Sequence, residues 1–528
     1  MKMQNTSTAT SVAFAAAMGL SAAAMAAVDA TYTGPAGTQS YDTPANWTPG
    51  VPGLSGNTND TATINDVAAN LTLQLNGATP TLKSVLFNDS NSELQLQTGT
   101  GGFLTFATTD ATTPTLNSVR TSGNSLFLYA DVRGTQGLTL SAGGAGAIFR
   151  TNAASNFANL SGTFTLAQGT LDPQAGSSGN GAVLPFTRFA LGTAGTASLQ
   201  VISGRNQTLA SLSGTSTAFV ANTTTAVSTL TLGDLTTDAV YAGAVGRRSD
   251  FTVATPTFGI NLIKRSAGTQ TISGNVYNDA LTVASRSAVT LNADGGTLVL
   301  GGNNTYRGTT TVNANSTLIF TGTHTPAAET DTVAGTILGA YNVQAGGMLR
   351  GTGTITPRVD NVVGGGVAVS IRGTLNPGLS GSDFGALNLD GINSVKSVLI
   401  DESTGTFAFD VGSSGGDRIN VANAAVADVR FSGGSTIAVN DLSGGALTGS
   451  VLLINTDRST NDVFGGLTFD ANGFVTAGVM LTGTQTYADA SLQAVEGDLY
   501  LVVPEPAALG LLGIGALGLL SRRRANAI

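Results

Sequence analysis

The segment TLVLGGNNTYRGTTTVNANSTLIF, residues 297–320, decides the expected fold. Its apolar residues alternate with others on both sides of a Gly-Asn turn at 301–304: Leu298, Leu300, Val312, Leu318 and Phe320. A period of two is typical of strands that bury one face, and Gly and Asn favour the turns between strands. The segment therefore predicts three short strands separated by turns.

Similar patterns recur along the chain. In ANLSGTFTLAQGTL, residues 158–171, Gly162, Leu166 and Leu171 resemble Gly308, Val312 and Leu318 of the first segment. Further alternating apolar positions are Leu82, Val85, Phe87, Leu281, Val283, Val289, Leu291, Leu387 and Leu389. Each patch is too short to bury its apolar face alone, so neighbouring units are expected to stack and cover one another. The expected fold is all-β, a β-solenoid of stacked parallel strands.

The composition agrees with this fold and excludes several functions. Charged residues make up 10% of the chain, against about 25% in ordinary globular proteins, and Gly and Thr are weak helix formers. The net charge of −9 argues against a nucleic-acid partner, which needs clustered Lys and Arg. The chain has no Cys, so disulfides, thiolate metal sites and Cys nucleophiles are excluded. We expect no cofactor.

The N-terminus has the features of an export signal. Lys2 precedes an apolar run from Val12 to Leu20, and Ala24-Met25-Ala26 forms a small-x-small cleavage site. Residues 1–26 are therefore predicted to be a signal peptide. The alternative is an Ala-rich helix within the fold.

The C-terminus combines Pro504-Glu505-Pro506, an uncharged run at 507–521 and the cluster Arg522, Arg523 and Arg524. As a helix, the apolar part of this run would span ~21 Å, short of a ~30 Å hydrocarbon core. A short transmembrane helix is still expected, because arginine side chains can reach the headgroups and a bilayer can thin locally. The arginines would lie inside and the rest of the chain outside.

This tail resembles the PEP-CTERM sorting signal, in which a Pro-Glu-Pro triplet, a short apolar segment and an Arg cluster follow in this order. The resemblance implies an exosortase-type processing enzyme as partner, cleavage near Pro504 to Pro506, and transfer to the cell surface or extracellular matrix. A plain membrane anchor is the alternative. Both interpretations place the protein outside the cytoplasm.

The segment at 301–318 resembles the autotransporter-associated β-strand repeat. Segments similar to that family are GGMLRGTGTI at 346–355, IRGTLNPG at 371–378, GALNL at 385–389 and GDRINV at 416–421. The N-terminal ANWTPGVP at 45–52 resembles the usual start of such proteins. The resemblance implies a right-handed parallel β-helix. Four parts are expected: the signal peptide 1–26, a β-helix repeat region 27–396, a C-terminal β region or solenoid cap 397–500, and a sorting signal with a transmembrane segment 501–528.

The sequence contains few residues that could act in catalysis. His324 is the only histidine, and its surroundings FTGTHTPAAET predict a solvent-exposed loop. Carboxylates are the remaining catalytic candidates, because polysaccharide-cleaving enzymes use them in pairs: Asp383, Asp390, Asp401, Glu402, Asp410 and Asp417. Turn capping at Asp383 and solvation at a strand end for Asp417 explain those two residues without catalysis.

Three other groups are weaker candidates. Asp457, Asn461 and Asp462 could bind calcium, although they lack EF-hand or nonapeptide spacing. Arg247 and Arg248 are expected in a solvated turn, and the Gly-rich segment at 351–353 at a corner of the solenoid.

We therefore expect a secreted, surface-displayed structural or adhesive protein and no enzyme. A polysaccharide is the most plausible partner, bound by Thr- and Asn-rich faces with aromatic residues such as Tyr306. The alternatives are a carbohydrate-active enzyme, either lyase or hydrolase, on the same scaffold, and a surface receptor for a small ligand or another cell.

Overall fold

The structure of the chain is a computed structural model. The structure describes residues 26–504 except 55, 66, 152–155, 174–187, 201–205, 223–226, 234–237, 247–258, 278–287, 292–294, 327–335, 361–366, 381–382, 391–396, 402–403, 423–427, 445–446 and 484–488. The predicted signal peptide lies almost entirely outside the described residues, as does the expected transmembrane segment at 507–520.

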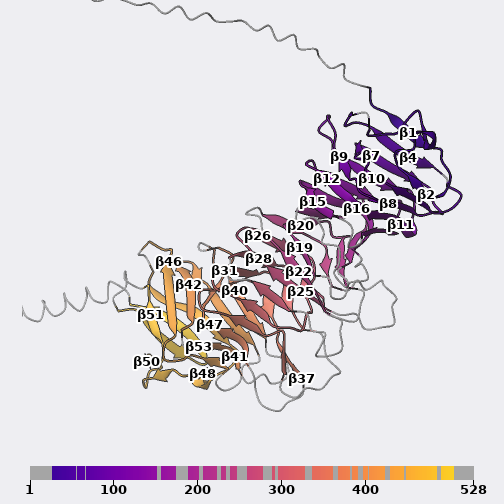
Figure 1. The fold of residues 1–528 in the computed structure, drawn as a ribbon. Coiled ribbons are helices and arrows are strands. Elements are labelled where there is room, and N and C mark those ends of the chain that lie inside the picture. Colours follow the sequence, from indigo (N-terminus) through magenta and orange to yellow (C-terminus); the bar gives the residue numbers. More distant parts are fainter. Residues whose placement is uncertain are drawn as a thin grey trace, which may run out of the picture.

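One ladder of parallel strands runs through the described chain and forms what we call the first face. Its strands stack side by side along the long axis of the molecule (Figure 1). They are β1 (Asp29–Tyr32), β4 (Thr61–Asn65), β7 (Ser84–Asn88), β10 (Thr115–Ser118), β13 (Leu138–Ser141), β16 (Thr163–Pro173), β17 (Arg188–Leu191), β20 (Ser211–Gly214), β23 (Ala239–Tyr241), β26 (Thr269–Ile272), β28 (Gly296–Leu300), β31 (Ser316–Phe320), β35 (Met348–Gly351), β39 (Thr374–Pro377), β42 (Thr406–Gly412), β46 (Thr436–Asp441) and β51 (Met480–Thr482).

After each strand of the first face, the chain continues into a second face. In the N-terminal half the second face contains β2 (Gly37–Ser40), β5 (Leu71–Gln74), β8 (Leu94–Gln97), β11 (Ser122–Tyr129), β14 (Gly146–Thr151), the end of β16, β18 (Ala197–Gln200), β21 (Phe219–Ala221) and β24 (Ala244–Val245). In the C-terminal half it contains β29 (Asn303–Asn304), β32 (Thr323–His324), β36 (Thr354–Ile355), β40 (Ala386–Asp390), β44 (Arg418–Ala422) and β47 (Gly449–Thr456).

A third face completes most of the described turns of the chain, and its strands are also parallel. They are β6 (Thr81–Leu82), β9 (Leu104–Phe106), β12 (Asp131–Gly134) and β15 (Asn156–Leu160), followed by β19 (Gln207–Leu209), β22 (Ser228–Leu232), β25 (Ile260–Lys264), β27 (Val289–Leu291), β30 (Thr310–Val312), β34 (Tyr341–Val343), β38 (Val367–Ile371), β41 (Ser397–Asp401), β45 (Val429–Arg430) and β48 (Phe464–Gly465). The protein is therefore all-β with parallel sheets, an arrangement consistent with the predicted β-solenoid.

The remaining elements are short. They are β3 (Trp47–Thr48), β33 (Thr336–Leu338), β37 (Arg358–Asp360), β43 (Gly415–Gly416), β49 (Thr468–Phe469), β50 (Val475–Ala477), β52 (Ser491–Val495), β53 (Asp498–Val503), and the 3-10 turns η1 (Pro44–Asn46) and η3 (Asn461–Val463).

Apolar side chains stack from turn to turn inside the three faces. On the first face Leu298 pairs with Leu318, which pairs with Leu349, which in turn pairs with Leu375. All four are fully buried, and truncating one such leucine costs roughly 2–5 kcal/mol. The alternation seen in residues 297–320 is thus the pattern of the core.

The two sequence copies do not occupy equivalent positions. Leu166 lies on the first face and Leu171 on the second, because β16 bends between them and pairs with strands of both faces. Gly169, at φ +107°, lies between these two leucines. By contrast, Val312 lies on the third face and Leu318 on the first. The two segments are similar because both alternate short strands with turns, but their strands lie on different faces of the stack.

The parallel ladders cross residue 397 without a break: β38 pairs with β41, and β41 with β45. Antiparallel pairing enters farther on, where β53 lies between β47 and β52. At the other end, β3 pairs antiparallel with β1, and Trp47 packs edge-on against Tyr32 with ring centroids 5.3 Å apart. Both ends of the stack therefore carry strands that differ from the repeating pattern.

Candidate functional site

The junction with the sorting tail is fixed by the last strand. β53 is the central strand of the antiparallel group β47, β53 and β52, and its final residue, Val503, is buried and pairs with Gly449. Pro504, the next residue, is exposed. The other predicted sorting residues lie outside the described residues: Glu505, Pro506, Arg522, Arg523 and Arg524. The folded stack therefore ends directly at the Pro-Glu-Pro triplet.

Among the carboxylate candidates, the structure brings Asp410 and Asp417 together. The backbone N–H of Asp410 donates to one carboxylate oxygen of Asp417 at 3.0 Å, and the N–H of Gly385 donates to the other at 2.7 Å. Asn440 donates its amide N–H to Oδ1 of Asp410 at 2.7 Å. Both aspartates are buried, so the prediction that Asp417 is solvated at a strand end was wrong.

Burial explains the electrostatics of this pair. Desolvation raises the pKa of Asp417 to about 6, and the charge of Asp410 acts in the same direction, while the two backbone hydrogen bonds and Arg350 oppose the shift. The Asp417 carboxylate closes the turn between β42 and β43 against the segment that precedes β40. Its hydrogen bonds hold β42 to the segment that precedes β40.

The other acidic candidates are dispersed. Asp383 is exposed and accepts a hydrogen bond from the Ser380 hydroxyl at 2.9 Å, as expected for a turn residue. Asp390 is half-buried at the end of β40. The side chain of Asp401 and the whole of Glu402 lie outside the described residues.

His324 is buried, and the prediction of an exposed loop was wrong. It lies in β32, and its ring stacks on Tyr306 with centroids 3.9 Å apart. Its Nε2 lies 2.8 Å from the Tyr306 carbonyl oxygen and its Nδ1 2.9 Å from the Tyr341 hydroxyl. Burial lowers the pKa of His324 to about 4, so the ring is neutral, with Nε2–H donating and Nδ1 accepting. Tyr306 is also fully buried, which removes it as a surface contact.

The proposed calcium ligands are engaged elsewhere. Asp462 forms an ion pair with Arg458 at 2.8 Å, and Asn461 donates to the Ala494 carbonyl and accepts from the Gly497 N–H. Within the described part of the chain, His, Asp and Glu form no group of three suited to a metal ion. Arg247 and Arg248 lie outside the described residues.

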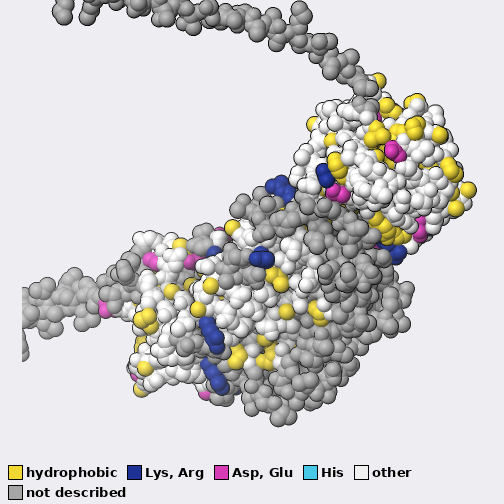
Figure 2. All heavy atoms as spheres, in the orientation of Figure 1, with side chains coloured by type: hydrophobic (Ala, Val, Ile, Leu, Met, Phe, Trp, Pro, Cys, Tyr) yellow, Lys and Arg dark blue, Asp and Glu magenta, His cyan; other side chains and the backbone are white. Residues whose placement is uncertain are grey.

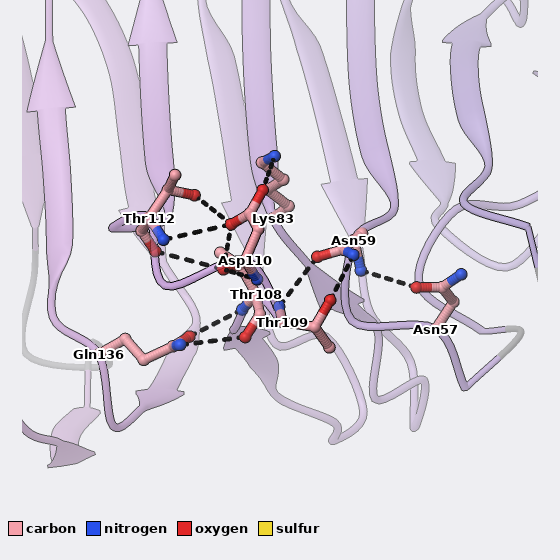
Figure 3. A network of polar contacts seen from close by, with 8 residues as sticks. All are labelled: Asn57, Asn59, Lys83, Thr108, Thr109, Asp110, Thr112 and Gln136. Atoms are coloured by element: carbon pink, nitrogen blue, oxygen red, sulfur yellow. Dashed lines mark hydrogen bonds and ion pairs between the residues drawn. The ribbon is translucent and has the colours of Figure 1, made fainter. Parts of the chain in front are cut away.

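A polar network on the N-terminal coils is likewise saturated (Figure 3). Asp110 accepts hydrogen bonds from Lys83, Thr108 and Thr112, which hold the pKa of its carboxyl well below the usual range. Gln136 and Asn59, which lie on other coils, bond the backbone of this loop at Thr108 and Thr109. The network joins the corners that precede four successive strands of the first face, β4, β7, β10 and β13, and leaves no Asp110 oxygen without a donor.

Sequence reasoning missed one surface feature. A hollow of about 440 Å³ on the second face is lined by Gln74, Asn76, Gln97, Thr98, Gly99, Thr100 and Tyr129. The outward glutamines of LTLQ at 71–74 and LQLQ at 94–97 were visible in the sequence. Their alignment with Tyr129 depends on the stacking register of three coils.

A known protein-family motif matches the C-terminus at the point where the last strand ends. Residues 502–524 match the PEP-CTERM protein-sorting motif, which begins one residue before the end of β53. The motif indicates a secreted protein that an exosortase-type enzyme sorts to the cell surface. No curated protein matches the chain. Among the described residues, no helix has the length and apolar character needed to cross a membrane.

Proposed function

We propose that this chain is a structural or adhesive protein of the cell surface, contributing a stiff polar rod to the envelope or to the extracellular polysaccharide matrix. One observation carries the proposal: the folded stack ends at Val503, inside the sorting motif. The other described coils extend away from that point along the long axis (Figure 1). A rod attached at the end where its sorting signal is processed presents its other end to the surroundings.

The surface supports a role in a hydrated matrix. Figure 2 shows a few Lys, Arg, Asp and Glu side chains on a face whose described atoms belong mainly to uncharged, non-hydrophobic side chains and to the backbone. Eight large apolar side chains among the described residues are exposed, with Val240 and Met480 the most exposed of them. Such a surface stays soluble without a strong electrostatic preference for one partner.

Several finer features belong to the proposal. The coils follow the autotransporter-associated β-strand repeat as a right-handed parallel β-helix over residues 27–396, with 397–500 as its end or cap. Residues 507–520 form a short membrane-spanning helix before exosortase cleavage near Pro504 to Pro506. The motivation is the sequence resemblance and the apolar tail.

The proposal includes the absence of catalysis. Asp410 and Asp417, the candidates that lie together, are buried, and both Asp417 oxygens accept backbone N–H groups. A carboxylate pair that cleaves a polysaccharide must reach the glycosidic bond. The enzyme alternative would gain support if the protein degraded acidic or neutral polysaccharides and Asp410→Asn or Asp417→Asn abolished that activity while the fold was retained.

Cell fractionation tests the sorting step. An epitope-tagged chain should reach the surface or matrix without its Arg522 to Arg524 tail. A variant with all three arginines changed to alanine, or Pro504→Ala with Pro506→Ala, should keep its tail and remain with the membrane. Arg418→Ala, which changes an exposed arginine of β44, is the matched control and should be processed normally. Wild-type protein recovered from the cytosol with both termini intact would contradict the proposal.

A further inference from the structure

We propose that the hollow on the second face binds a neutral polysaccharide chain. Its floor contains Gln74, Gln97 and Tyr129, which pair in register on three adjacent strands, β5, β8 and β11. Adjacent strands lie about 4.8 Å apart, so one polar side chain is presented per coil. This repeat suits an extended polymer that crosses the coils.

The wall of the hollow is built from two stacked corners. The Oδ1 atom of Asn76 accepts the N–H of Thr100 at 3.1 Å, which holds the corner after β5 against the corner after β8. Gly99 leaves room for this contact, because a Cβ at that position would overlap the Asn76 amide. The wall is therefore held in place without a ligand.

The aromatic ring of the hollow packs against a second aromatic side chain of the same strand. Tyr129 packs edge-on against Phe127, with ring centroids 5.4 Å apart. The Arg150 guanidinium lies 5.7 Å from the centre of the Phe127 ring and pairs with Asp172 at 3.2 Å. Because the contact with Phe127 restricts the phenol ring, less conformational entropy is lost when a sugar packs on it.

Polar groups for sugar hydroxyls remain available beside the ring. Gln97 donates one amide hydrogen to Gln95 at 2.9 Å, which orients it and leaves its own oxygen as an acceptor. Within the described residues, neither the Gln74 amide nor the Tyr129 hydroxyl has a hydrogen bond to another side chain or to the backbone. Amides that both donate and accept match the hydroxyl groups of a sugar.

The same observations argue against other ligands. The lining side chains carry no charge, and the chain has a net charge of −9, which disfavours an anionic polymer or a nucleic acid. A peptide that binds by adding a strand to the sheet would need a free strand edge. Here β5 is paired with β2 and β8, and β8 with β5 and β11.

The position of the hollow suits adhesion. It lies on the first coils of the stack, at the opposite end from β53 (Figure 1). This inference rests on the proposed function, since it names what a surface-held rod would contact.

Affinity electrophoresis of the full chain in gels containing hydroxyethylcellulose, dextran or galactomannan tests the inference, with alginate as the anionic comparison. At least one neutral polymer should retard the protein. Tyr129→Ala and Gln74→Ala should each lower the association constant at least tenfold. Gln344→Ala is the matched control, because Gln344 is a half-buried glutamine like Gln74 but lies elsewhere on the rod; it should bind like the wild type. Circular dichroism checks that each variant is folded.

Three results would overturn the inference: no retardation by any of the neutral polymers, retardation by alginate alone, or retardation that persists unchanged in folded Tyr129→Ala and Gln74→Ala variants. A chain that is correctly displayed on cells and gives one of these results would refute the sugar site while leaving the structural role intact. Mislocalisation would instead refute the proposed function.

Discussion

The imidazole Nδ1 of His324 lies 2.9 Å from the hydroxyl oxygen of Tyr341, although these residues belong to strands on different faces of the stack. The His324 Nε2 reaches the carbonyl oxygen of Tyr306 from its other side. One neutral ring therefore connects three segments within the core.

Removing this ring should destabilise the protein. His324→Ala leaves the Tyr306 carbonyl and the Tyr341 hydroxyl without their partner and opens a cavity beside Tyr306, so we expect a loss of roughly 2–4 kcal/mol. Urea unfolding followed by circular dichroism measures the change. A loss below about 1 kcal/mol would show that the buried ring contributes little.

The pH dependence of stability should reveal two opposing groups. The pKa of His324 is lowered from 6.5 to about 4, so between these values the unfolded chain binds a proton that the folded chain does not, and acidification destabilises the fold. The pKa of Asp417 is raised from 3.8 to about 6, so in this range the folded chain holds the extra proton and acidification stabilises the fold.

Single substitutions separate these contributions. Relative to the wild type, Asp417→Asn should lose stability more steeply as the pH falls from about 6 to about 4, and His324→Gln should lose it less steeply. Urea midpoints measured across this range give the slopes, and differences from the wild type cancel the titration of other groups. Identical slopes in all three proteins would argue against both shifts.

Gln270 supplies hydrogen bonds at a place on the first face where two neighbouring strands are poorly paired. Strands β20 and β23 pair only at Gly214 and Tyr241. The buried Gln270 side chain accepts the Leu212 N–H at 3.1 Å and donates to the Leu212 carbonyl at 2.8 Å. The amide therefore replaces strand pairing that β23 does not provide.

Gln270→Leu should cost roughly 2–5 kcal/mol, because two buried backbone groups lose their partner. Gln39→Leu, which removes one 3.3 Å bond near the surface, is the control and should cost less than about 1 kcal/mol. Equal unfolding free energies for the two variants would contradict the role assigned to Gln270.

Gly351 is required by close backbone packing. It has φ +138°, and a Cβ there would overlap the Phe320 carbonyl oxygen. Gly415 has a similar φ of +145°, but a Cβ there meets nothing within 4 Å. Gly351→Ala should therefore be less stable than Gly415→Ala by roughly 2 kcal/mol, since only the first adds a steric clash to the shared backbone strain. Thermal unfolding of the pair measures the difference, and matching midpoints would rule out a steric requirement.

The strand pattern was predictable because it is local. Leu298 and Leu318 belong to alternating runs, and these runs form the ladder of the first face. The burial of His324 was not predictable from the sequence, because the Gly, Thr and Pro residues beside it are typical of a loop. Its burial depends on contacts with Tyr306 and Tyr341 in neighbouring coils. The register that aligns Gln97 with Tyr129 is likewise a property of stacking. Short-range periodicity predicts strands, and contacts between coils decide which polar residues are enclosed.

The central position of β53 between β47 and β52 has a mechanical consequence. Tension applied to the tail along the strand direction would load the hydrogen bonds to both neighbours at the same time, as in a shear joint, instead of peeling them apart one by one. The attachment point can then resist flow past the cell, because many hydrogen bonds must break together before β53 leaves the fold.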